Sequence, residues 1–209
     1  MKSFLDFIIS GGPLMIPIIL CSVIALGVFL ERLFYLRRKK NIPEDLLRDV
    51  EDLLKTDRVN DVLSLLRRDR SPMARIFLAA MKNYGKSRET IKVAVEEIGG
   101  QEAEYLNKYV VVLSVIAQVS PLLGLLGTVQ GMIQVFNKVV SGSVADPSQM
   151  AGGISVALIT TAGGLTVAIP ALIGYHYLLG KANDLILDMQ QYSIGLVELI
   201  KGDDGGEQP

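Results

Sequence analysis

Charged residues are missing from three long stretches of this sequence. Residues 7–30, 109–137 and 147–180 contain no Asp, Glu, Lys or Arg, in runs of 24, 29 and 34 residues. A helix of roughly 20 apolar residues crosses a bilayer core of about 30 Å. Each run is long enough to span a membrane, and the sequence therefore predicts three transmembrane helices rather than one soluble domain.

Cysteine and histidine are almost absent too. The single Cys21 cannot form a disulfide within the chain, and we expect it to be a small core residue of the first span. The lone His176 stands near the end of the third run, with no Gly-x-Ser-x-Gly motif to supply a nucleophile and no cluster of metal ligands in the spans. No phosphate-binding loop and no basic–aromatic pattern for nucleic acid is present. We therefore expect no enzyme, no cofactor and no metal.

Basic residues predict the orientation of the spans. Lys2 alone precedes the first run, whereas a cluster that includes Arg37 to Lys40 follows it. Positive charge beside a span marks the cytoplasmic side, and a basic cluster after a long run argues against a cleaved signal peptide. The predicted layout is an outside N-terminus over 1–12, a first span over 13–36, a cytoplasmic helical domain over 37–107, a second span over 108–140, a periplasmic loop over 141–150, a third span over 151–180 and a cytoplasmic tail over 181–209.

The cytoplasmic segment has the pattern of several short helices. "PEDLLRDVEDLLKT" and "VNDVLSLLRRD" place apolar residues at i, i+3 and i+4, which predicts two amphipathic helices. Ser71 and Pro72 predict an N-cap and the first residue of a further helix, which Gly85 is suited to end. Ser87 predicts the cap of a last helix, which we expect to continue through Gly99-Gly100 to the second span. The charged residues here are typical of a solvated surface, and the tail "GDDGGEQP" is typical of disorder.

Small residues form a stripe along each of the last two spans. Such faces let membrane helices approach closely. Two interpretations stay open: the stripes pack within a bundle, with their threonines bonded to their own helices, or they line a pore or clasp a partner helix. Hydroxyls near mid-span and the length of both helices favour the second. The candidate pore-lining or helix-packing residues are Ala117, Pro121, Gly124, Gly127 and Gly131 with Thr128 in the second span, and Gly153, Ala157, Gly164, Ala168 and Pro170 with Thr161 in the third.

Two of these candidates are prolines within the predicted helices. Pro121 and Pro170 each remove a backbone hydrogen bond and favour a kink. They are either tolerated bends in a packed bundle or points of flexing that help a ring of helices to turn or widen.

The motifs "SPLLGLLGTVQGMIQVF" and "GGISVALITTAGGLTVAIPALIGYHYL" resemble the signature helices of the MotA/TolQ/ExbB proton-channel family. The resemblance covers nearly the whole chain, and three spans in 209 residues are similar to its ExbB/TolQ branch. It implies an all-α protein of the bacterial inner membrane, forming a homopentamer around two ExbD/TolR-type single-span partners. A membrane aspartate of the partner then carries the proton past threonines that match Thr128 and Thr161, with Thr160 a weaker candidate. The implied function is a motor subunit that converts proton motive force into work on envelope proteins.

Three positions depart from the family pattern. Val156 stands where many members have a glutamate, which leaves open a non-conducting membrane scaffold of the same fold. Ser120 replaces the usual alanine. His176 replaces a common asparagine, as a structural hydrogen-bonder or as a sensor of pH. Ion-coupled membrane proteins usually place an ionisable group at membrane depth. The three uncharged runs contain no Asp, Glu, Lys or Arg, and His176 lies near the cytoplasmic end of the third span. A proton relay through these spans therefore needs a carrier from another protein.

Overall fold

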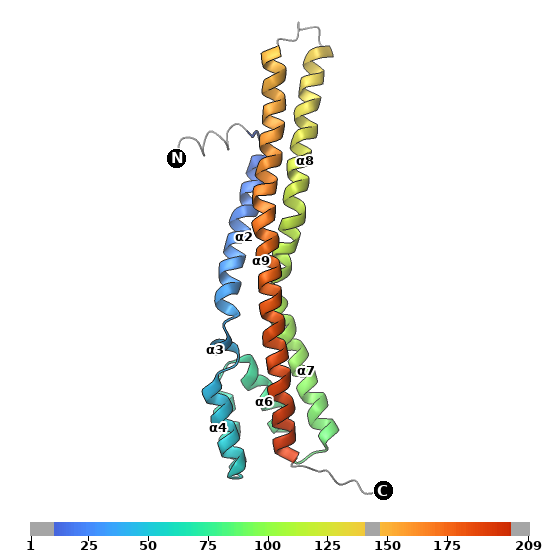
Figure 1. The fold of residues 1–209 in the computed structure, drawn as a ribbon. Helices are drawn as coiled ribbons and strands as arrows, with labels where there is room; N and C mark the ends of the chain where they lie inside the picture. Colours follow the sequence, from blue (N-terminus) through green and yellow to red (C-terminus); the bar gives the residue numbers. More distant parts are fainter. Residues whose placement is uncertain (1–10, 141–146, 202–209) are drawn as a thin grey trace. The chain divides into compact units, whose positions relative to one another are not determined.

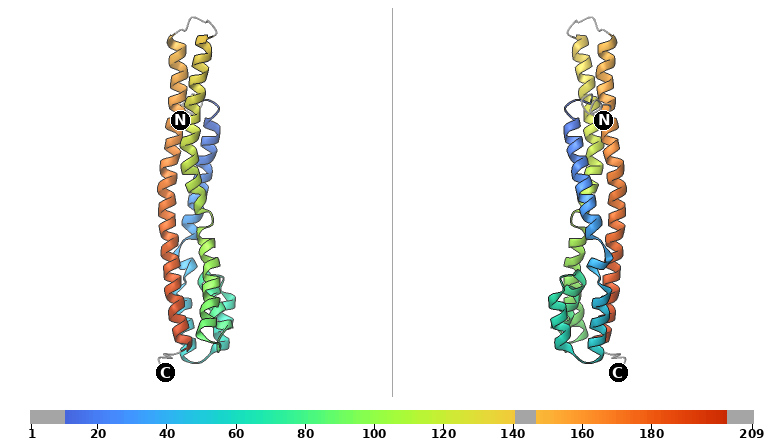
Figure 2. Two further views of the ribbon diagram at one scale, coloured as in Figure 1. Left: turned by 90° about the vertical axis from the view of Figure 1, so that its right-hand side faces the viewer. Right: turned by 90° about the vertical axis from the view of Figure 1, so that its left-hand side faces the viewer.

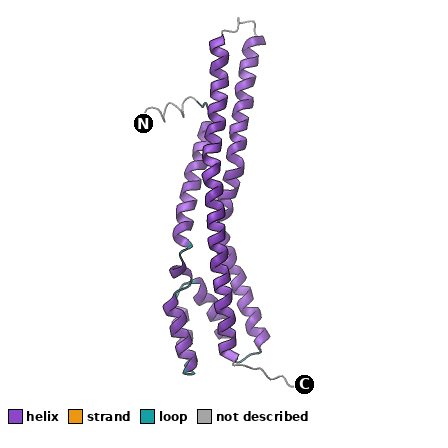
Figure 3. Ribbon diagram, viewed as in Figure 1, coloured by secondary structure: helices purple, strands orange, loops and turns teal. Residues whose placement is uncertain are grey.

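All of the secondary structure in the computed structural model is helical across the described residues, 11–140 and 147–201 (Figure 3). The predicted all-α fold is confirmed for these residues. The expectations for the first residues of the chain, for most of the loop after the second span and for the tail beyond 201 fall outside them. In chain order the helices are α2 Met15–Tyr35, α3 Arg38–Asn41, α4 Glu44–Lys55, α5 Val59–Arg68, α6 Pro72–Lys82, α7 Arg88–Asn107, α8 Val110–Val140 and α9 Pro147–Lys201 (Figure 1).

The chain divides into two compact units, which we name for their composition. The membrane unit comprises Met1–Arg32 and Tyr109–Tyr177, and the polar unit comprises Leu33–Lys108 and Leu178–Pro209. Most of α2, all of α8 and the first part of α9 belong to the membrane unit. The helices α3 to α7 and the last part of α9 belong to the polar unit.

The membrane unit contains long apolar helices. One segment in each of α2, α7–α8 and α9 is long and apolar enough to cross a membrane, which confirms the prediction of three spans. At 1.5 Å per residue, the 31 residues of α8 and the 55 residues of α9 measure about 47 and 83 Å, well beyond a bilayer core of about 30 Å. Within this unit α8 and α9 lie side by side in every view (Figures 1 and 2).

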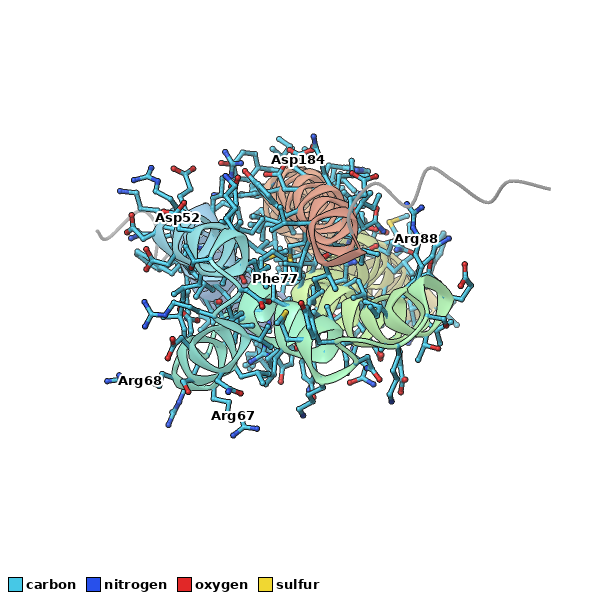
Figure 4. The ribbon with its side chains drawn as sticks, turned by 90° about the horizontal axis from the view of Figure 1, so that it is seen from below. Asp52, Arg67, Arg68, Phe77, Arg88 and Asp184 are labelled. Carbon is cyan, nitrogen blue, oxygen red and sulfur yellow. The ribbon has the colours of Figure 1, made fainter. Side chains whose placement is uncertain are left out.

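The polar unit is built around α6. Most of α6 is buried, and Phe77 lies at the centre of the surrounding helices, whereas Asp52, Arg67 and Arg88 stand at the periphery (Figure 4). The last part of α9 is held to this core by an apolar stripe at helical spacing, which explains why the helix continues to Lys201, some 20 residues past the predicted span. The buried residues of that stripe are Leu178, Ala182, Leu185, Met189 and Leu196.

The ends of α6 and α7 are fixed by local hydrogen bonds. The Ser71 hydroxyl accepts a hydrogen bond from the Ala74 N–H at 3.2 Å, with proline at the first helical position. The Ser87 hydroxyl accepts one from the Thr90 N–H at 3.3 Å. Between these helices Gly85 has a φ of +85°, a left-handed conformation that glycine adopts without a Cβ clash. These three predictions from the sequence are confirmed.

Candidate functional site

The tightest helix contact of the membrane unit joins α8 to α9. A methyl group on Gly164 would lie 2.5 Å from the Ser120 carbonyl oxygen and 3.3 Å from the Gly124 Cα. A methyl group on Gly124 would lie 2.9 Å from the Thr161 Cα. Backbone therefore touches backbone here, and only glycine fits at these two positions. The glycine faces that the sequence singled out meet each other within one chain.

The other candidate residues lie along or beside this contact. A methyl group on Gly131 would lie 2.9 Å from the Ala157 Cβ, and one on Gly127 would lie 2.5 Å from the Thr160 Cγ2. Packing between α8 and α9 thus accounts for the small-residue stripes in a single chain, and their part in lining a pore stays a prediction. Ala117, Gly127, Gly131, Ala157 and Ala168 are buried, Pro121 and Gly153 are half-buried, and Pro170 is exposed.

Thr161 bridges the two helices. Its hydroxyl donates a hydrogen bond to the Gly124 carbonyl oxygen at 2.9 Å. The bond forms because the glycine at this position brings the α8 backbone within reach of a short side chain on α9. Interhelical bonds of this kind contribute about 0.6 kcal/mol on average in a membrane.

Thr128 uses its hydroxyl within its own helix. The half-buried side chain donates to the Leu125 carbonyl oxygen at 2.7 Å, one turn back on α8. Exposed Thr166 on α9 makes the same kind of bond, to the Ala162 carbonyl oxygen at 2.8 Å. Neither bond holds two helices together. A hydroxyl in this state can turn to another acceptor without loosening the α8–α9 contact.

Thr160 faces the beginning of α2. Its buried hydroxyl lies 2.6 Å from the Gly11 carbonyl oxygen and 2.8 Å from the Val156 carbonyl oxygen, and it donates toward both. A methyl group on Gly12 would lie 3.4 Å from the Val156 side chain. These contacts attach the residues before α2 to α9 and favour a structural role for Thr160. The sequence could not reveal this tie, because the two partners are 149 residues apart.

Ser120 is a polar residue in the centre of the contact. It is fully buried, and its hydroxyl has no hydrogen-bond partner among the described residues. Its backbone carbonyl is the atom against which Gly164 packs. In the sequence, the only indication of this position was a serine where the family resemblance leads one to expect an alanine.

The few ionisable groups of the membrane unit lie near the ends of its helices. Arg32, at the end of α2, is buried, with its guanidinium 2.9 Å from the Glu31 carboxylate and 4.7 Å from the Tyr109 ring centroid. Exposed His176 contacts the Tyr175 ring edge to face at 5.0 Å. Across the described ranges no group of His, Cys, Asp and Glu side chains is arranged to hold a metal ion.

These features define a class: an all-helical membrane protein whose long, glycine-packed helix pair carries hydroxyls but no carboxylate or amine in its apolar part. A family model described as the MotA/TolQ/ExbB proton channel family matches residues 68–191. Because the match takes in more than half of the 209 residues, the chain belongs to this family.

Curated relatives point to the ExbB/TolQ branch. The chain is 36% identical over 182 residues to the putative biopolymer transport protein ExbB-like 1 of Synechocystis sp., which covers 83% of this chain and 70% of the relative. It is 30% identical over 203 residues to the putative ExbB homolog of Methanothermobacter thermautotrophicus, covering 94% and 67%. It is 40% identical over 88 residues to the Tol-Pal system protein TolQ of Haemophilus influenzae, covering 42% and 39%. The chain is thus a membrane protein of a family that transduces energy.

Proposed function

We propose that this chain is the channel-forming subunit of a proton-driven motor in the bacterial inner membrane. Five copies, each with its N-terminus outside, surround two single-span ExbD/TolR-type partners that carry a membrane aspartate. The complex converts proton motive force into mechanical work on envelope proteins. Membership of the family and the similarity to ExbB and TolQ proteins support this proposal.

The observation that carries the proposal is what the spans contain and what they lack. The runs 109–137 and 147–180 hold threonine hydroxyls but no Asp, Glu, Lys or Arg. Ion-coupled membrane proteins place an ionisable group at membrane depth. This chain needs a carboxylate from another protein, and its own contribution is to make that carboxylate less costly to ionise.

The hydroxyl of Thr128 is suited to that task. An ionised group at mid-membrane costs about 2.5–3.5 kcal/mol on insertion scales. A hydrogen bond from Thr128 to a carboxylate is charge-assisted and roughly twice as strong as its present bond to a backbone carbonyl. The exchange of acceptor is favourable once the partner's proton has left. Thr161 would have to give up its bond to α8, so it contributes chiefly by holding the helix pair in place.

The test compares two isosteric changes on the same background. Thr128→Val keeps the side-chain shape and removes the hydroxyl, while Thr166→Val makes the same change to a hydroxyl that also bonds within its own helix. We expect both variants to assemble and to retain the partner in co-purification. Thr128→Val should abolish proton-driven work in cells, whereas Thr166→Val should retain it. Full activity of Thr128→Val would show that this threonine is a packing residue.

A non-conducting scaffold of the same fold is the second candidate. The observation behind it is Val156, an exposed aliphatic side chain at the position where the family resemblance implies a glutamate. In our proposal the partner's aspartate and the hydroxyls of this chain suffice for conduction. The scaffold and the channel differ in one measurable property, proton flux through the complex.

A further inference from the structure

The segment that follows α2 carries a cluster of cations. The 21 residues of α2 end at Tyr35 and measure about 32 Å, close to the thickness of a bilayer core, about 30 Å. The basic residues that come next are all exposed, and α3 gathers them in a single helical turn: Arg37, Arg38, Lys39 and Lys40. A turn that directly follows a span of this length lies at the level of the lipid headgroups.

This turn is held in place by buried side chains. Leu36 and Ile42, on either side of the cations, are fully buried. The side-chain amide of Asn41, which is buried too, donates to the carbonyl oxygens of Tyr35 at 2.8 Å and of Arg37 at 3.0 Å. The backbone of α3 is therefore fixed while its basic side chains stay at the surface.

Two of the cations rest on aromatic rings. The Arg37 guanidinium lies 4.6 Å from the Phe34 ring centroid, and the Lys40 ammonium lies 4.9 Å from the Tyr35 ring centroid. The Lys40 N–H donates to the Arg37 carbonyl oxygen at 3.0 Å, so these two residues are neighbours one turn apart. We call Arg37 and Lys40 the α3 cation pair. A ring covers one side of each cation and leaves N–H groups on the other sides to donate.

Among the described residues no ion pair joins the α3 cation pair to a carboxylate. The acids closest to it along the chain and on α9 have other roles. Glu31 forms an ion pair within α2 at 2.9 Å, and Asp188 on α9 pairs with Arg38 at 3.2 Å. Glu44 and Asp45 stand in the first turn of α4, where the helix N-terminus stabilises negative charge. The α3 cation pair thus keeps its charge for a ligand from outside the chain.

We propose that the α3 cation pair binds the phosphate of an acidic phospholipid such as phosphatidylglycerol. Arg37 and Lys40 donate charge-assisted hydrogen bonds to the phosphate oxygens. Phe34 is 56% exposed, and its ring lies against the beginning of the acyl chains, as aromatic side chains do at a membrane interface. A zwitterionic lipid such as phosphatidylcholine binds less well, because its choline brings a positive charge beside the same cations. This lipid site goes beyond the proposed channel and does not depend on it.

The test measures which lipid the purified full-length chain retains. The chain is equilibrated in detergent micelles with equal amounts of phosphatidylglycerol and phosphatidylcholine, and native mass spectrometry identifies the most strongly retained lipid. We expect phosphatidylglycerol in excess. Because each cation near an acidic lipid changes the binding constant about fivefold, the double change Arg37→Gln, Lys40→Gln should lower this preference about 25-fold.

The matched control removes the same charge elsewhere. Arg88 and Lys92 are exposed at the beginning of α7, whose 20 residues form about 30 Å of helix before α8 begins. We expect the double change Arg88→Gln, Lys92→Gln to leave the lipid preference unchanged. Equal losses in the two double variants would overturn the site, since they would show an effect of net charge alone. A wild-type chain without preference for phosphatidylglycerol would overturn it as well.

A third variant keeps every charge. Phe34→Leu removes the ring beneath Arg37, and we expect the preference for phosphatidylglycerol to fall about two- to fivefold. An unchanged preference would contradict the part given to the ring, and this variant decides the matter alone if the double variant does not fold. Inorganic phosphate at the concentration of the lipid should not displace phosphatidylglycerol. Displacement would show that the cations bind a soluble anion instead, and would overturn the lipid site.

Discussion

A single methyl group at Gly164 should separate α8 from α9. In the structure that methyl would lie 2.5 Å from the Ser120 carbonyl oxygen and 3.3 Å from both the Gly124 Cα and its nitrogen. All three obstacles are backbone atoms, and none can rotate away as a side-chain end does. The helices have to move apart by about 1 Å to restore ordinary van der Waals distances of about 3.5 Å.

The cost follows from what that movement breaks. Overpacking a well-packed contact costs about 1–3 kcal/mol. The hydrogen bond from Thr161 to the Gly124 carbonyl lies in the same contact and adds about 0.6 kcal/mol when it is stretched. The better helix propensity of alanine offsets about 1 kcal/mol of this loss. We expect Gly164→Ala to lower the free energy of unfolding by about 0.6–2.6 kcal/mol.

Unfolding by SDS in mixed micelles, followed by circular dichroism, measures this difference. The matched control is Gly27→Ala in α2, because a methyl group there would meet no atom within 4 Å. The control should be neutral or stabilised by up to about 1 kcal/mol. If Gly164→Ala is as stable as the control, α8 and α9 do not approach each other closely at Gly164 and Gly124.

Three further changes probe separate contacts. Thr161→Val should lower stability by about 0.6 kcal/mol while Thr128→Val leaves it nearly unchanged, because only Thr161 bonds to the other helix; equal losses in the same SDS titration would contradict this. Arg75→Gln should destabilise the polar unit by about 3 kcal/mol, because it leaves the buried Glu102 carboxylate without its partner. Glu102→Gln should cost only about 1–2 kcal/mol, because the half-exposed Arg75 guanidinium can be hydrated when alone. Thermal melts measure both losses, and the reverse order would contradict this account. The hydrogen bond from Arg75 to Glu102 raises the pKa of the guanidinium above its ordinary value. The arginine's contribution to stability is therefore complete below that ordinary value and is lost only as the pH rises through the raised pKa, so it should stay constant across neutral pH. Gly85→Ala should cost about 1–2 kcal/mol in the same melts, because its φ of +85° is left-handed, and an unchanged melting temperature would argue against that turn.

Much of the fold could be predicted because each signal is local. A run without charges is enough to identify a span, and a serine followed by proline or by a helical pattern is enough to place a helix start, as at Ser71 and Ser87. The partner of a glycine face is not a local property. The spacing of Gly124 and Gly164 shows that another helix approaches them, but a helix of the same chain and a helix of another chain satisfy the same spacing.

Contacts between residues far apart in the sequence could not be predicted from it either. Arg75 pairs with Glu102 across 27 residues, and nothing in either helix alone distinguishes this carboxylate from its solvated neighbours. The sequence predicts only the first part of α9, because the uncharged run that identifies the third span ends at about residue 180. The apolar repeat that carries the helix on to Lys201 is amphipathic and is anchored by a core the sequence alone does not display.

Proton flux in liposomes tests the central proposal most directly. The purified chain is reconstituted with the proposed partner, a single-span ExbD/TolR-type protein that carries a membrane aspartate. A membrane potential is then imposed, and an internal pH-sensitive dye reports proton entry. We predict flux that requires both proteins, falls to background with Thr128→Val and persists with Thr166→Val. Flux no greater than that of liposomes with either protein alone would contradict the channel and identify the chain as a scaffold.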